Sequence, residues 1–158
     1  MQAWNPYFTA MAGVAAVLTG LIFIAVSNNL RQILEEPTLP GRAGETLILL
    51  VESLLVSLIA LIPGMSRTAL GVAVLVMGIA GISLPAMIQL RTTSIKGAPA
   101  YVWVRLVGTQ LATWPVIVAG VWILADGSSG VYWLAAGTAA LTLMAVLNAW
   151  VLQIEIRR

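Results

Sequence analysis

One glutamate lies inside an apolar stretch of this sequence, where a carboxylate must be neutralised or take part in chemistry. The stretch covers residues 47–63, LILLVESLLVSLIALIP, and Glu52 is its single charged residue. A charged side chain at the centre of a bilayer costs about 2.5–3.5 kcal/mol on insertion scales. An intramembrane carboxylate therefore indicates an ion site, a proton site or an ion pair, and each of these needs further polar groups nearby.

Polar residues in other apolar segments could supply those groups. Arg105 lies near one end of the fourth segment, and its long side chain can reach inward or snorkel outward. Asn148, Gln110 and Ser57 extend the expected cluster. Three interpretations stay open: a structural Glu52–Arg105 pair that fixes helix register, an ion or proton site on a conduction path, and a protonated Glu52 that acts as a neutral hydrogen-bond donor.

Two further polar groups lie where apolar segments end. Ser27, Asn28 and Asn29 end the first segment, where they could line or gate the mouth of a path. Ser66 and Arg67 belong to the short turn PGMSR. Ser66 is expected to cap the following helix, and the helix N-terminus together with Arg67 could hold an anion. The simpler interpretation is a capped turn between two antiparallel helices.

The same turn carries a local resemblance. LIPGMSRTALG resembles the P-G-x-S-R-S-G segment of the undecaprenyl-pyrophosphate phosphatases, a segment that helps to bind phosphate in that family. The match covers Pro63, Gly64, Ser66 and Arg67, with Thr68 in place of the serine. The resemblance implies a phosphate site and a lipid phosphatase. The acidic motif of the family is absent here and the chain is far shorter, so the capped turn is favoured.

The composition indicates an integral membrane protein. Of the 158 residues, 60% are hydrophobic and 9% are charged, and the mean hydropathy is +0.99. A soluble domain has about 25% charged residues. We expect one transmembrane domain over residues 1–158. The absence of cysteine and histidine removes thiol nucleophiles and the usual zinc ligands, so we expect no enzyme, no metal and no cofactor. The scattered basic residues predict no nucleic-acid surface.

Five apolar segments predict an all-α bundle of five transmembrane helices. Each has about the 20 residues that a spanning helix needs. The expected spans are residues 7–28, 46–62, 68–90, 101–125 and 131–154. Residues 31–45 are expected to form a polar loop, broken by Pro37, Pro40 and Gly41. The first segment lacks a basic n-region and an A-x-A-like site, so it is expected to be retained rather than cleaved as a signal peptide.

The basic residues predict the orientation of the bundle. With five spans, seven of the eight basic residues fall on one side: Arg31, Arg42, Arg91, Lys96, Arg105, Arg157 and Arg158. Only Arg67 falls on the other side. The positive-inside rule then places the N-terminus outside and the C-terminus in the cytoplasm.

Small residues recur at helical spacing and predict close helix contacts. Gly13 and Gly20 lie seven residues apart in the first segment, and Gly71 and Gly78 lie seven apart in the third. Such residues let helix backbones approach closely in lipid. The contacts could lie within one chain or between copies, and a homo-oligomer is expected.

The first half of the chain resembles a family of short bacterial multi-span membrane proteins. The similarity rests on AAVLTGLIFIAVSNNLRQIL followed by PTLPGRAGETLILL, and on a W-N-x-Y/F start. Some members are labelled as modulators of the FtsH membrane protease. The resemblance implies a multi-pass protein of the bacterial inner membrane with a membrane protein partner, and it supplies no catalytic residues.

Three functions follow as hypotheses. The favoured one is a homo-oligomeric ion channel or small-solute transporter in the lipid bilayer, because five spans with short loops leave little surface for other work. The alternative is a membrane partner or modulator protein, in which the polar cluster is structural and residues 31–45 form the contact surface. The third is a lipid-phosphate enzyme that uses the turn at Ser66.

Overall fold

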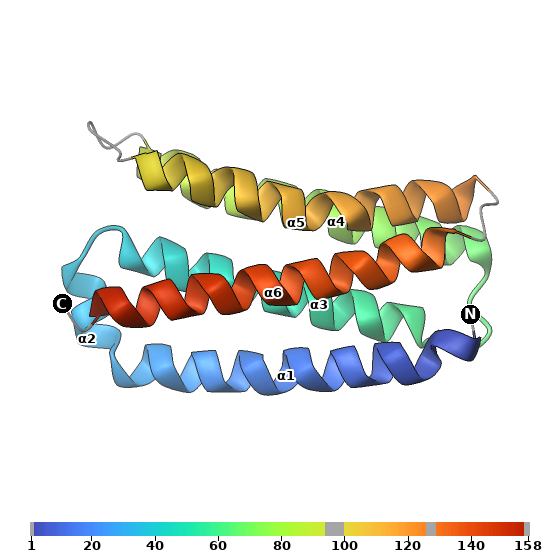
Figure 1. The fold of residues 1–158 in the computed structure, drawn as a ribbon, viewed down its shortest axis with the longest axis horizontal. Coiled ribbons are helices and arrows are strands. Elements are labelled where there is room, and N and C mark those ends of the chain that lie inside the picture. Colours follow the sequence, from blue (N-terminus) through green and yellow to red (C-terminus); the bar gives the residue numbers. More distant parts are fainter. Residues whose placement is uncertain (1, 94–99, 126–128, 157–158) are drawn as a thin grey trace.

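The chain forms an all-helical bundle. The computed structural model describes residues 2–93, 100–125 and 129–156, with side chains for residues 3–90, 105–125 and 129–155. A 3-10 turn, η1, covers Gln2–Trp4. The α-helices are α1 (Asn5–Asn28), α2 (Leu30–Glu35), α3 (Leu39–Ala60), α4 (Arg67–Thr93), α5 (Ala100–Leu124) and α6 (Gly130–Ile156). These described ranges contain no strand (Figure 1).

Five of the helices, α1 and α3–α6, are long and apolar enough to cross a membrane. Each of the five expected spans overlaps one of them, so the prediction of a five-helix membrane bundle is confirmed at this level. The two ends of the chain lie at opposite ends of the bundle, as an odd number of spans requires (Figure 1).

The start of α3 differs from expectation. Pro40 and Gly41 were expected to break helical structure, but α3 begins at Leu39 and contains both residues in its first turn. A proline fits there because the first N–H groups of a helix have no partner within the helix. The prediction of a loop over residues 31–45 was therefore wrong. Arg42 and Glu45 belong to α3, and both are buried.

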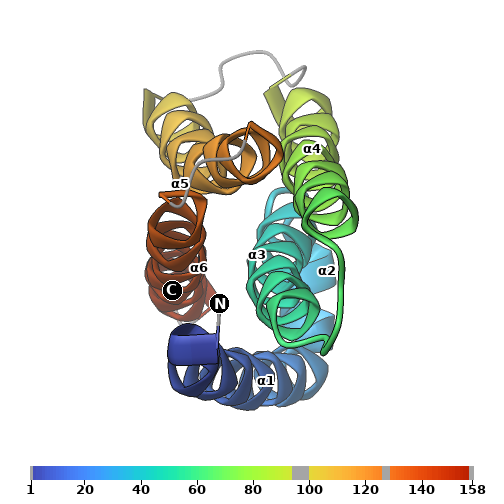
Figure 2. The same cartoon turned by 90° about the vertical axis from the view of Figure 1, so that its right-hand side faces the viewer.

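Helix α3 lies at the centre of the helix arrangement. It packs against α1, α4 and α6, while α5 packs against α4 and α6. Seen end-on, α4 and α5 form one side of the bundle, α1 forms the opposite side, and α3 and α6 lie between them (Figure 2). Helix α3 is therefore bordered by α1 on one side, α4 on the opposite side and α6 beside it (Figure 2).

Polar side chains face the interior of this bundle, and large apolar side chains cover its outside. Leu21, Leu111 and Leu147 are each more than half exposed. The buried polar residues among the described side chains are Arg42, Glu45, Thr46, Glu52, Ser53, Ser57, Gln89, Arg105, Thr109, Thr113, Thr138, Thr142 and Asn148. This distribution suits a protein surrounded by lipid, because its polar groups must then find partners within the protein.

The two glycine pairs lie in different environments. Gly71 and Gly78 of α4 are in close contact with α5, where Leu124 and Ile117 leave no room for a Cβ atom. Their contacts therefore lie within one chain. Gly13 and Gly20 of α1 are exposed, and a Cβ atom at either would meet nothing within 4 Å. This face of α1 is open to lipid or to another molecule.

Candidate functional site

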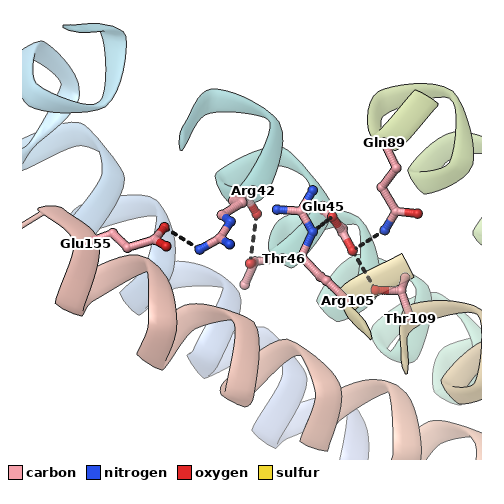
Figure 3. Close-up of polar contacts among 7 residues, drawn as sticks. All are labelled: Arg42, Glu45, Thr46, Gln89, Arg105, Thr109 and Glu155. Carbon is pink, nitrogen blue, oxygen red and sulfur yellow. Dashed lines mark hydrogen bonds and ion pairs between the residues drawn. The ribbon is translucent and has the colours of Figure 1, made fainter. Parts of the chain in front are cut away.

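A fully buried carboxylate joins three helices near one end of the bundle. Glu45 of α3 has 0% of its surface exposed. Nε of Arg105 on α5 lies 3.3 Å from its Oε2 atom. Nε2 of Gln89 on α4 donates a hydrogen bond of 2.6 Å to Oε1, and the Thr109 hydroxyl donates one of 2.5 Å (Figure 3). Glu45 is thus held as a carboxylate that connects α3, α4 and α5.

A second ion pair connects the same end of α3 to α6. Nη1 of Arg42 binds Oε2 of Glu155 (Figure 3). The Thr46 hydroxyl donates a hydrogen bond of 2.9 Å to the Arg42 carbonyl oxygen. Arg42, Glu45, Arg105 and Glu155 together are called the charged cluster below. Each carboxylate in it has an arginine partner.

The expected Glu52–Arg105 pair is not formed, because Arg105 pairs with Glu45. Glu45 lies seven residues before Glu52, and at 1.5 Å per residue the two are about 10 Å apart along the helix axis. Seven residues correspond to about two helical turns, so both side chains lie on the same face of α3. Once α3 begins at Leu39, Glu45 is the acidic residue at the depth of Arg105.

Glu52 is a buried acidic residue for which the described part of the chain supplies no hydrogen-bond donor. Its side chain is 3% exposed, and neither carboxyl oxygen has a hydrogen-bond partner among the described residues. The carboxyl group lies against Gly81 of α4, where a Cβ atom would overlap it. An unpaired neutral polar group costs about 1–3 kcal/mol. An isolated buried carboxylate costs tens of kcal/mol on a continuum scale, so Glu52 marks a place where something must compensate.

The other residues of the expected cluster are spread through the bundle. The Ser57 hydroxyl donates to the Ser53 carbonyl oxygen at 2.8 Å. Nε2 of Gln110, which is partly buried, donates to the Ile82 carbonyl oxygen of α4 at 3.4 Å. Asn148 is buried, and its Nδ2 atom lacks a partner within the described part of the chain. None of these described side chains makes a hydrogen bond to the Glu52 carboxyl group.

A chain of hydroxyl groups joins α3 to α6 and α1. Ser53 lies 2.9 Å from the Thr142 hydroxyl and donates to the Thr138 carbonyl oxygen at 3.1 Å. The Tyr7 hydroxyl donates to the Ala135 carbonyl oxygen at 2.8 Å and lies 3.3 Å from the Thr138 hydroxyl. The sequence signal for this network was the spacing of Thr138 and Thr142, four residues apart on one face of a helix.

The residues at the end of α1 do not join the buried set. Ser27 and Asn28 are exposed. Nδ2 of Asn29 donates to the Ala25 carbonyl oxygen one turn earlier, at 2.8 Å. The structure therefore gives these three residues no place in the interior of a single chain.

The turn after α3 forms the expected cap. The Ala69 N–H donates to the Ser66 hydroxyl at 3.2 Å, which confirms Ser66 as the N-cap of α4. Gly64 has a φ of 71°, a left-handed conformation that glycine adopts at no steric cost. Arg67 is exposed beside it. Glu45 lies near the opposite end of α3, so the turn does not approach the charged cluster.

No protein family, curated protein or solved structure matches this chain. The chemistry of the site is therefore inferred from its geometry. Among the described residues, no group of three acidic side chains is placed to hold a metal ion. The interior instead offers one paired carboxylate at Glu45, one unpaired carboxyl group at Glu52, and a row of hydroxyl groups beyond it.

Loss of the Ser66 cap is expected to destabilise the start of α4. Ser66→Ala should lower the free energy of unfolding by about 1 kcal/mol, because the Ala69 N–H loses its side-chain acceptor. Denaturant unfolding in detergent micelles measures this change. Ser66→Asp is the matched control, because an aspartate restores the acceptor. A loss of the same size in both variants would contradict the capping role.

Proposed function

We propose that the protein is a non-enzymatic membrane transport protein, an ion channel or small-solute transporter. The transported ion or solute would cross the interior of the bundle along a path that is lined by Glu52. The observation that carries this proposal is the buried Glu52 carboxyl group, which has no hydrogen-bond partner among the described residues. A purely structural carboxyl group in lipid is expected to be paired, as Glu45 is.

The arrangement of polar groups supports a path within one chain. Glu45, Glu52 and Ser53 follow one another on the buried face of α3. The Ser53 hydroxyl then contacts the Thr142 hydroxyl, and this network extends to Tyr7. The Glu45–Arg105 ion pair would act as a gate, since opening it would expose a charged group to the path. A path lined by a carboxyl group favours cations over anions.

The proposal also covers assembly and orientation. The exposed glycine face of α1 at Gly13 and Gly20 supports contact between copies in a homo-oligomer. We place the C-terminus in the cytoplasm of a bacterial inner membrane, because most basic residues belong to that end of the predicted topology.

One observation favours the alternative of a membrane partner or modulator protein. Glu45 has three side-chain partners, which is the arrangement expected of a cluster that only fixes helix positions. The contact surface would then be α2, where Leu30 and Leu34 are exposed. Crosslinking from α2 in native membranes tests this function, and recovery of crosslinks between copies alone would argue against it.

Cation flux into liposomes tests the proposed transport function. Glu52→Gln keeps the size and polarity of the side chain but removes its ability to carry a charge or exchange a proton. We expect the flux to fall by at least about tenfold. Glu36→Gln is the matched control because Glu36 is exposed, and its flux should equal that of the wild type. Equal flux in the wild type and Glu52→Gln would overturn the proposal.

A further inference from the structure

We propose that Glu52 is a proton-binding site, in which the carboxyl group takes up and releases one proton within the bundle and Gly81 positions it. This inference rests on the proposed transport function, since the proton would be the transported or the coupling ion. It is carried by the lack of a counter-ion for Glu52 among the described residues and by the space that Gly81 leaves for its carboxyl group.

Within the described side chains, no counter-ion for Glu52 is found on the helices around α3. Helix α1 contains no charged residue, and its titratable Tyr7 is bound to the Ala135 carbonyl oxygen. Helix α4 carries Arg67 at its exposed start, and the side chain of Arg91 lies outside the described part. The charges of α5 and α6, Arg105 and Glu155, are paired with Glu45 and Arg42.

The surroundings of Glu52 suit a proton better than a metal cation. Dehydrated divalent cations bind about six or more oxygen atoms. The nearby Ser53 and Ser57 hydroxyls already make hydrogen bonds to other groups. The carboxyl group lies directly against the α4 backbone at Gly81, which leaves no space for a side chain there. A proton needs no such set of ligands and adds almost no volume.

The two buried glutamates of α3 are assigned different protonation states. Glu45 is assigned the charged form, since the Arg105 guanidinium lies 3.3 Å from its Oε2 atom and Gln89 and Thr109 donate hydrogen bonds to Oε1. Glu52 has no donor directed at it within the described residues and is neutral when at rest. Glu45 is therefore an internal control for any reagent that reacts with protonated carboxyl groups in an apolar environment.

Dicyclohexylcarbodiimide is such a reagent. The protonated carboxyl group adds across one C=N bond to give an O-acylisourea, and acyl transfer to nitrogen then gives a stable N-acylurea. We expect mass spectrometry of the labelled protein to find the adduct on Glu52 and none on Glu45. The labelled fraction should fall by about tenfold per pH unit on the alkaline side, as a single titrating group requires. Gly81→Ala should shift the pH of half-maximal labelling, and Ala139→Val, at an exposed position of α6, should leave it unchanged.

Infrared difference spectra between acidic and alkaline pH give a second measurement that does not depend on access of the reagent. We expect a protonated carboxyl band that is present in the wild type and absent in Glu52→Gln. Absence of both the adduct and the band would overturn the proton site. Protection of Glu52 from labelling by sodium or potassium ions at constant pH would also overturn it, in favour of a metal-cation site.

The outcomes separate this inference from the proposed function. If Glu52 shows pH-dependent labelling while Glu52→Gln retains full flux, the proton site stands and the transport path is wrong. If Glu52→Gln loses flux but Glu52 gives neither the adduct nor the infrared band, transport stands and the proton is not the ion bound there.

Discussion

Replacing Arg105 with methionine is expected to lower the free energy of unfolding by about 3–5 kcal/mol. The substitution keeps most of the apolar stem but removes the charge that lies 3.3 Å from Glu45. Glu45 is fully buried, so its carboxylate would keep the hydrogen bonds from Gln89 and Thr109 but lose the ion pair with Arg105. The substitution destabilises the protein because it leaves the Glu45 charge in the bundle interior without a counter-ion.

Denaturant titration in detergent micelles, followed by tryptophan fluorescence, measures this loss. Arg31→Met is the matched control because Arg31 and Glu35 form an ion pair one helical turn apart on the exposed surface. Exposed pairs of this kind often contribute nothing measurable. The double variant Arg105→Met/Glu45→Met should recover much of the stability, since no charge is left unpaired. A loss no larger than that of Arg31→Met would show that the buried pair does not hold α3 against α5.

The sequence was sufficient for the features that depend on one segment at a time. Each spanning helix is a long apolar run, so five helices could be expected without any knowledge of their packing. The cap at Ser66 is equally local, because the donor is the N–H of Ala69, three residues later in the same segment. The burial of Glu52 followed from its place within the apolar run of α3.

The prediction of the partner of Arg105 depended on where α3 begins. Treating Pro40 as a breaker placed Glu45 at the edge of the membrane and left Glu52 as the nearest acid. Proline in the first turn instead begins α3 at Leu39, and this adds almost two turns before Glu45. The signal that could have corrected the prediction was the spacing of Glu45 and Glu52, which places both on the same face of α3.

Contacts between helices could not be predicted from the sequence. Gln89 and Gly81 are unremarkable in the sequence of α4, and they gain a role only because α4 packs beside α3. Gln89 then donates to Glu45, and Gly81 leaves space for the Glu52 carboxyl group. Which helices are neighbours depends on the packing of the whole bundle, and a single sequence gives no measure of it.

The second large effect concerns this contact between Gly81 and Glu52. Gly81→Val is expected to lower the free energy of unfolding by about 1–3 kcal/mol, because the new side chain would overlap the Glu52 carboxyl group. The same substitution in a Glu52→Ala background should cost much less, since truncation at position 52 leaves space that the valine can fill. Denaturant titration of the four proteins gives the coupling between the two positions.

Ala139→Val is the matched control for this cycle, because Ala139 is exposed on α6. It should change the stability little and show no coupling to Glu52→Ala. An equal cost of Gly81→Val in both backgrounds would mean that the valine meets the α3 backbone rather than the carboxyl group. A large coupling would instead show that the position of the Glu52 carboxyl group depends on the space at Gly81, which the proton site requires.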